Sequence, residues 1–125
     1  HRLGIAMESA DAAVFKLSEL QQDSPMPQIK RRRIIGEKAM LSEILIEKGC
    51  EAPSHHHENE QFLVLLDGRL RMELGVGDSA RTVILEAGDV LLLPSNVPHG
   101  GVALENSRIL DIFSPPSAMT GIDQR

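Results

Sequence analysis

Aromatic side chains are almost absent from this 125-residue chain, which has no Trp, no Tyr and only three Phe. Proteins that bind single-stranded nucleic acids stack the bases on rows of aromatic side chains, so the composition argues against that class of partner. The net charge of −5 also argues against a surface that follows a phosphate backbone. The hydrophobic core must therefore be built from Leu, Ile, Val, Ala and Met, and no nucleic-acid partner is expected.

Cysteine and long apolar segments are scarce as well. The single cysteine, Cys50, rules out an internal disulfide bond. No apolar run approaches the ~20 residues that span a bilayer, so no membrane partner is expected. The N-terminus lacks the basic-then-apolar pattern of a signal peptide, and we expect a cytoplasmic protein. The length fits one domain.

Short apolar runs separated by Gly, Pro and Asp fill the chain after Pro27. The runs are about 5–8 residues long and show no 3.6-residue period, which indicates strands rather than helices. Many short strands with turns between them are typical of an all-β sandwich or a closed jelly-roll barrel. We expect strands at roughly Ile29–Ile35, Ala39–Glu47, Gln61–Leu66, Arg69–Leu74, Arg81–Leu85, Val90–Leu93, Gly101–Glu105 and Arg108–Phe113.

One dipeptide gives a local turn signal. Asp67-Gly68 stands between two apolar runs and predicts a tight hairpin, because both residues tolerate a positive φ. In the run that follows, Leu70, Met72 and Leu74 alternate with charged residues. That alternation predicts a half-buried strand.

Histidines supply the clearest chemical signal. His55, His56 and His57 are consecutive. The simplest interpretation of such a run is a polar loop without a chemical role. In an extended strand, however, residues two apart point to the same face, so His55 and His57 can converge on one ion while His56 points away. Gln61 shares their parity, and His99 follows a turn made rigid by two prolines. Three imidazole nitrogens and one oxygen would leave coordination positions for water or substrate.

The spacing of these residues resembles a known family. Gly49-x5-His55-x-His57-x3-Gln61-x6-Gly68 resembles the first cupin motif, and Gly88-x5-Pro94-x-Asn96-x2-His99 resembles the second. The chain departs from the usual pattern at three positions: Gln61 stands for Glu, Asn96 for Gly, and Ala103 for an expected Asn.

The resemblance implies a fold and a cofactor. The fold is the all-β double-stranded β-helix of cupins, a jelly-roll barrel expected over residues 28–116, with an N-terminal extension over 1–27 and a tail over 117–125. The cofactor is one divalent transition metal ion (Zn, Ni, Fe or Mn). Its implied ligands are His55, His57, Gln61 and His99.

Gln61 bears on the chemistry of such a site. Three neutral imidazoles and a neutral amide oxygen leave the ion its full +2 charge, which suits a Lewis acid acting on an anionic or enediol-like substrate. The same ligand set stabilises a ferric ion less well than a carboxylate would, so it favours non-redox chemistry without excluding an oxygenase. The simpler role for Gln61 is a hydrogen bond to a ligand histidine.

A closer resemblance runs from about Ile34 to Pro116. The histidine motif, together with Leu110-Asp111-Ile112-Phe113-Ser114-Pro115-Pro116, is similar to the pectin-degradation cupins of the KdgF type. Those small metal cupins open cyclic 4,5-unsaturated uronates to the linear keto form. The resemblance implies that reaction here, with Asp111 as the proton-transfer residue and Phe113 as an apolar wall. The simpler roles are a buried carboxylate that fixes a loop or a ligand, and core packing.

Arginine is missing where that family has it. The family pattern continues with Arg after the two prolines, and this chain has Ser117. Because an arginine is the natural partner of a uronate carboxylate, we expect Arg31, Arg33 or Arg108 to bind the substrate instead. The simpler interpretation of the basic run at residues 30–33 is a solvated edge that prevents association between strands.

Two other functions fit the same motifs. One is an Fe(II) cupin dioxygenase acting on a small organic acid or thiol, and the other is a cupin that binds a small ligand without catalysis. All three functions need a small-molecule partner, and the resemblance further implies a homodimer. Phe62 is expected in the core, which leaves Phe113 as the aromatic residue that faces the cavity.

Overall fold

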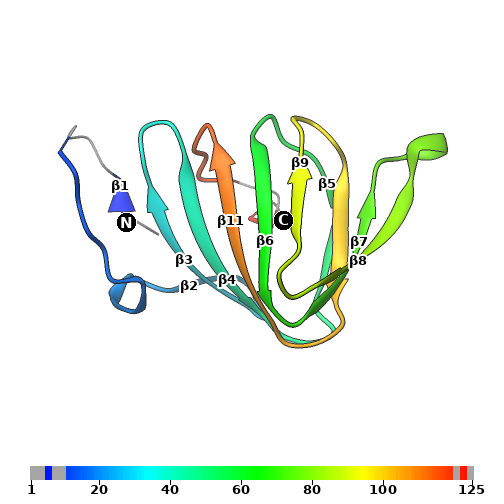
Figure 1. Cartoon of the computed structure of the whole chain (residues 1–125), viewed down its shortest axis with the longest axis horizontal. Helices are drawn as coiled ribbons and strands as arrows, with labels where there is room; N and C mark the ends of the chain where they lie inside the picture. The colour runs from blue at the N-terminus through cyan, green and yellow to red at the C-terminus, as the bar shows by residue number, and fades with distance from the viewer. Residues whose placement is uncertain (1–4, 7–10, 120–121, 124–125) are drawn as a thin grey trace.

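Two β-sheets pack face to face in the computed structural model, which describes residues 5–6, 11–119 and 122–123. The first sheet has the strand order β1-β3-β4-β11-β6-β9, with β2 added on β3, and Figure 1 shows these strands from left to right. The second sheet has the order β5-β10-β7-β8. The strands are β1 (Ile5–Ala6), β2 (Asp23–Met26), β3 (Ile29–Ile35), β4 (Met40–Ile46), β5 (Glu51–His55), β6 (Glu60–Asp67), β7 (Arg69–Leu74), β8 (Arg81–Glu86), β9 (Val90–Leu93), β10 (His99–Ala103) and β11 (Ser107–Ser114).

The predicted all-β jelly-roll fold is confirmed. Each of the eight expected strands has a counterpart in β3, β4 and β6–β11, and β5 is an additional strand that ends at the first of the three consecutive histidines, His55. Short 3-10 turns at Leu17–Glu19 and Gly77–Ser79 are the helical elements of the described chain. Within that part of the chain, no helix has the length and apolarity needed to cross a membrane.

Side chains alternate between the core and the solvent. On β7, Leu70, Met72 and Leu74 are buried and the charged residues between them are exposed, as the sequence predicts. Apolar residues from both sheets meet between them, where their removal from water supplies the main stabilising free energy. The buried apolar cluster consists of Ile29, Ile44, Cys50, Leu63, Leu65, Leu70, Met72, Leu74, Leu85, Leu93, Ala103 and Ile109.

The predicted hairpin at Asp67-Gly68 is wrong. β6 pairs with β11 and β9, whereas β7 pairs with β10 and β8, so the chain crosses from one sheet to the other at Gly68. Gly68 has a φ of 96°, as a Gly turn residue should. The dipeptide therefore correctly indicates a sharp bend, but turn chemistry does not determine which sheet the next strand joins.

The expectation that Phe62 packs in the core is also wrong. Gln61, Leu63 and Leu65 are the residues of β6 whose side chains point inward. Phe62 has the opposite parity, lies on the outer face and is 39% exposed. A strand that is apolar on both faces gives no signal for which face is covered.

The solvated-edge interpretation fails for two of the basic residues. β3 is an interior strand that pairs with β4 on one side and with β1 and β2 on the other. Arg31 and Arg33 point inward and are only 1% and 2% exposed. Both β1 and β2 come from the stretch expected to be an N-terminal extension, so this stretch contributes to the sheet that buries the two arginines.

Substitution of Gly68 tests the crossover. A Cβ there would lie 2.5 Å from the Asn106 carbonyl oxygen and 2.6 Å from the Ser107 Cα, in addition to the positive φ. Gly68→Ala should lower the free energy of unfolding by about 3 kcal/mol or more in urea titrations. Gly88→Ala is the matched control, since Gly88 has the same φ of 96° and a Cβ added there would have nothing within 4 Å; it should cost about 1 kcal/mol. Equal losses in both variants would contradict the close approach at Gly68.

Candidate metal centre

Three histidines converge at one end of the sandwich. His55 ends β5 and His99 begins β10, and the two are register partners in the second sheet. His57 lies two residues after His55, in the loop between β5 and β6. Their imidazole rings lie 4.4 Å (His55–His99), 5.0 Å (His57–His99) and 6.0 Å (His55–His57) apart between centroids. One nitrogen from each ring lies within 4.8 Å of the others, so the three could hold one metal ion.

Backbone carbonyls determine which nitrogen each ring offers. His55 Nδ1 lies 2.8 Å from the Pro53 oxygen, and His99 Nδ1 lies 2.8 Å from the Val97 oxygen. His57 Nδ1 makes the same contact, at 3.0 Å, with the Asn59 oxygen. Because a carbonyl oxygen can only accept, each Nδ1 carries the proton and each Nε2 keeps its lone pair. This arrangement presents three Nε2 donors to a cation.

Gln61 brings a fourth donor from the opposite sheet. Its amide nitrogen donates to Asp111 Oδ1 at 2.8 Å, which turns its Oε1 towards the histidines. Oε1 then lies 3.1 Å from His57 Nε2. Both of these atoms are acceptors in the tautomer described above, and a cation shared by them resolves the conflict. The chemistry of the donor set therefore fits a divalent metal ion, with the identity of the metal left open.

Burial keeps two of the imidazoles neutral. Loss of solvent lowers the pKa of His99 to about 4, and the hydrogen bond to Val97 only partly offsets that effect. Burial likewise lowers the pKa of His55, against an opposing hydrogen bond to Pro53. Neutral imidazole is the form that binds metals, so these ligands need not lose a proton near neutral pH.

The second motif is tied directly to the first. Asn96 has a φ of 64°, a left-handed conformation that Asn tolerates better than most residues, which explains how it replaces Gly. Its backbone N–H donates to the His57 carbonyl oxygen at 2.8 Å. This hydrogen bond holds the loop before His99 against the loop that carries His57.

Asp111 and Phe113 come from β11, beside Gln61 on β6. Phe113 is the register partner of Gln61, is 3% exposed and lies 5.7 Å from the His57 ring. Asp111 is 9% exposed. Burial raises the pKa of Asp111 to about 7, although the hydrogen bond from Gln61 acts in the opposite direction. Both side chains line the same cavity, as their shared parity predicts.

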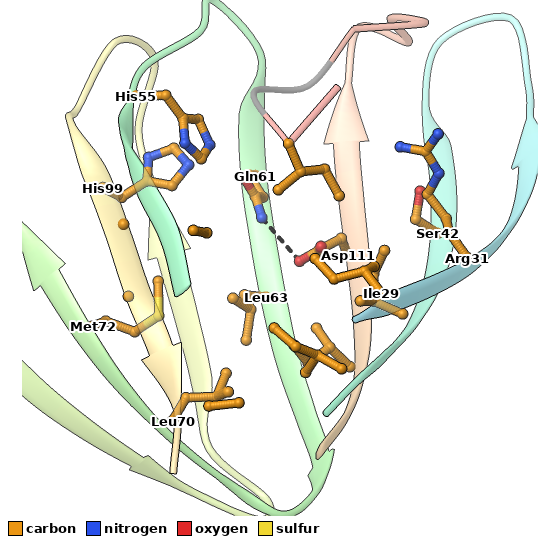
Figure 2. A pocket seen from close by; sticks show the side chains of 18 of the residues that line it. Ile29, Arg31, Ser42, His55, Gln61, Leu63, Leu70, Met72, His99 and Asp111 are labelled. Carbon is orange, nitrogen blue, oxygen red and sulfur yellow. Dashed lines mark hydrogen bonds between the residues drawn. The ribbon is translucent and has the colours of Figure 1, made fainter. Parts of the chain in front are cut away.

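The cavity has a polar rim and an apolar floor. Figure 2 shows His55, His99, Gln61 and Arg31 around its upper part, with Asp111 near the middle. Leu63, Leu70 and Met72 lie lower in the same view. The lining residues are Ile29, Arg31, Ser42, Ile44, Ile46, Ala52, His55, Gln61, Leu63, Leu70, Met72, His99, Gly100, Gly101, Val102, Ala103, Ile109, Asp111, Phe113 and Ile122.

The three candidate arginines have different positions. Arg31 lines the cavity. Arg33 is buried outside the cavity lining, where one guanidinium nitrogen donates to the Ala118 carbonyl oxygen at 3.2 Å and Nε has no partner. Arg108 lies on the outer face of the first sheet, where it pairs with Glu43 at 2.8 Å. The structure therefore brings neither Arg33 nor Arg108 to the cavity.

Arg31 is held by two carboxylates that sequence reasoning missed. Its guanidinium contacts Asp23 of β2 at 2.6 and 3.1 Å, and Asp123 near the C-terminus at 2.8 Å through two separate nitrogens. Burial tends to lower the pKa of Arg31, but the hydrogen bonds to Asp123 and Asp23 outweigh it and raise that pKa. Ile122, next to Asp123, lines the cavity. Neither carboxylate lies in a motif or near the histidines in sequence.

Comparisons with known proteins agree with this geometry. A family model described as "Cupin domain" matches residues 42–113. KdgF from Halomonas sp. is 26% identical, with 86% of this chain and 97% of that chain covered and a TM-score of 0.78. An RmlC-like cupin from Shewanella frigidimarina is 23% identical, with 90% and 97% covered and a TM-score of 0.76. No curated protein matches the chain.

A larger enzyme shares the fold alone. The oxalate decarboxylase of Lactobacillus farciminis, in its formate complex, is 17% identical with a TM-score of 0.74. The match covers 91% of this chain and 36% of that one. The architecture is therefore common to proteins of quite different length.

Removal of one histidine tests the centre. His57→Ala should reduce the bound metal, measured by mass spectrometry of purified protein, to about one tenth or less of the wild-type content. A chelator should lower the melting temperature of the wild type but leave that of His57→Ala unchanged, because bound metal stabilises only the protein that holds it. His56→Ala is the control, since His56 is exposed and should keep full metal content. Equal metal loss in both variants would contradict the three-histidine site.

Proposed function

The chain belongs to the cupin family, and from that premise we propose that it is a metal-dependent enzyme that opens the ring of a 4,5-unsaturated uronate. The observation that carries the proposal is the buried Asp111, hydrogen-bonded to Gln61 beside three converging histidines. The similarity to KdgF over nearly the whole length of that chain supports the same reaction.

The metal site would bind and polarise the substrate. His55, His57, His99 and the Oε1 atom of Gln61 would hold a divalent cation, which when bound supplies a Lewis acid for the oxygen atoms of a sugar acid. These four donors are neutral, so an anionic ligand meets an uncompensated positive charge. This property favours non-redox chemistry over an Fe(II) dioxygenase.

Asp111 is the proposed proton-transfer residue. In the reaction the anomeric hydroxyl loses a proton and the bond between the anomeric carbon and the ring oxygen breaks, which gives an aldehyde and an enolate. The enolate then gains a proton on carbon and becomes the ketone. A carboxyl group with a pKa of about 7 holds and releases a proton with similar ease near neutral pH. Asp111 lines the cavity and accepts a hydrogen bond from Gln61, one of the four proposed metal ligands. It would therefore lie beside the oxygen atoms of a metal-bound substrate.

Phe113 is proposed as an apolar wall for the substrate. Its ring packs edge-on to His57, and no other aromatic residue lines the cavity in the described chain. A single ring can shield one side of a small sugar acid from water without offering the stacked surface that a planar aromatic ligand needs.

We further propose a homodimer formed through the outer face of the first sheet. Register places Ile34, Leu41, Ile112, Phe62 and Leu92 in one row across five adjacent strands. Phe62, Ile112 and Leu92 are 39%, 37% and 49% exposed. An apolar row of this extent on an uncovered sheet is typical of an interface. A second copy can place the same row on itself, as a two-fold interface requires.

The catalytic proposal is tested by Asp111→Asn. The variant should keep its metal but lose turnover of an unsaturated galacturonate by about 10²–10⁴-fold, since that is the usual contribution of a proton-transfer group. Turnover is followed by the loss of enol-ether absorbance above the spontaneous rate. Glu60→Gln is the control. It also converts a carboxylate to an amide, but at an exposed residue next to Gln61 on β6, and it should leave turnover unchanged.

Two results would count against the proposal. If the wild type does not accelerate the reaction, the uronate function is wrong. If Asp111→Asn and the wild type turn over equally fast, Asp111 has no part in proton transfer.

Phe62→Asp tests the homodimer. A charge within the apolar row should convert the dimer to monomer in sedimentation experiments, with no change in metal content. Val76→Asp is the control, since Val76 is 62% exposed and lies outside the row. A wild type that sediments as a monomer, or a Phe62→Asp variant that remains dimeric, would contradict this interface.

A further inference from the structure

Arg31 is a buried cation at the wall of the cavity. Its side chain is 1% exposed, yet the residue lines the cavity that also contains His55, His99 and Asp111. Two carboxylates each make two contacts with its guanidinium, Asp23 and Asp123. Paired contacts of this kind are how arginine recognises a carboxylate ligand.

The two carboxylates belong to different parts of the structure. Asp23 lies on β2, a strand that contributes no residue to the cavity lining, and neither carboxylate is itself a lining residue. Asp123 lies near the C-terminus, and its neighbour Ile122 is itself a lining residue. The C-terminal segment, residues 117–119 and 122–123, thus places both an apolar side chain at the cavity and a carboxylate on its arginine.

Charge balance requires an anion at each of the two carboxylate positions. Arg31, Arg33, Asp23 and Asp123 form a buried group of two positive and two negative charges, in which both carboxylates act on Arg33 as well. Without Asp123, as without Asp23, the group would carry a net positive charge beside the cavity. A buried charge without compensation is costly, so an anion must occupy that position.

We infer that Arg31 is the carboxylate-binding residue of the cavity, and that Asp123 occupies the ligand's place on it until a ligand carboxylate displaces it. This inference rests on the proposed function, because it names the group that recognises the acid of the substrate. The ligand class is a small hydroxy acid whose carboxylate and hydroxyl oxygens are separated by the width of the cavity.

The arrangement of the polar rim agrees with that ligand. Figure 2 shows Arg31 on the side of the cavity opposite His55 and His99, with Gln61 and Asp111 between them. A sugar acid spanning the rim would place its carboxylate at Arg31, its hydroxyl oxygens at the histidines and its reacting atoms near Asp111. When the ligand carboxylate replaces Asp123 on Arg31, the positive charge of the arginine remains compensated.

Asp123 competes with a ligand carboxylate for Arg31, and it is favoured because it belongs to the same chain. A tethered group has an effective concentration on the order of millimolar, so it weakens the binding of any free carboxylate to the same arginine. Removal of its charge should therefore tighten the binding of acids and leave the binding of neutral sugars unchanged.

The test compares D-galacturonate with D-galactose, which lacks the carboxylate, by calorimetry on the metal-loaded protein. Asp123→Asn should bind galacturonate about tenfold more tightly than the wild type, with galactose binding unchanged. Asp23→Asn is the matched control, because it removes an equal charge from the same guanidinium but belongs to β2, a strand with no residue in the cavity lining, and it should produce no such gain. Galacturonate is a saturated acid, so this result does not depend on turnover.

Three outcomes would overturn the inference: unchanged galacturonate binding in Asp123→Asn, an equal gain in Asp23→Asn, or an equal gain for galactose. Amide hydrogen exchange of the unmodified protein provides an independent test if a variant does not fold. Saturating galacturonate should increase exchange severalfold in the peptide that carries Asp123 but not in the peptide that covers β3. Equal exchange with and without galacturonate would also overturn the inference.

Discussion

The hydrogen bond from the Gln61 amide to Asp111 joins the two halves of the site. It orients the amide so that Oε1 faces His57, and it holds a buried carboxyl group next to the donor set. The bond exists because β6 and β11 are antiparallel neighbours whose inward residues alternate in step. Gln61 and Asp111 of the first sheet thereby face His55 and His99 of the second sheet and His57 of the loop between β5 and β6. A slip of one residue between β6 and β11 would turn Gln61 or Asp111 to the solvent.

Much of the site could be predicted from the sequence because its geometry is local. The convergence of His55, His57 and Gln61 is predicted from the two-residue period of an extended chain. The three do converge, although His57 lies in the loop between β5 and β6 and Gln61 lies in the other sheet. The tautomers could not be predicted, because they depend on the Pro53, Asn59 and Val97 carbonyls that fold back onto the rings. Because of those contacts, all three histidines present Nε2 to a metal ion.

The predictions from sequence were wrong where a local pattern does not determine which strand or side chain a residue packs against. Gly68 bends the chain as expected, but the strand after it joins the other sheet, and the bend itself carries no information about that choice. Phe62 lies on a strand apolar on both faces, so its parity alone could not show which face is covered. Arg31 resembled an exposed edge residue because its two carboxylates lie on β2 and near the C-terminus, at sequence separations of 8 and 92 residues.

A buried arginine contributes little to stability, so its position in the structure points to a role in function. A buried ion pair commonly contributes less free energy than apolar residues of equal volume, because two charges must leave water. Arg31 carries this cost beside the cavity, although Ile29, Ile44 and Ile109 around it show that apolar residues fill the same face readily. With Phe113 as the aromatic contribution to the lining, discrimination between ligands depends on the metal donors, Asp111 and Arg31. Polar groups gathered at one rim above an apolar floor select a ligand by the spacing of its oxygen atoms rather than by the shape of a ring.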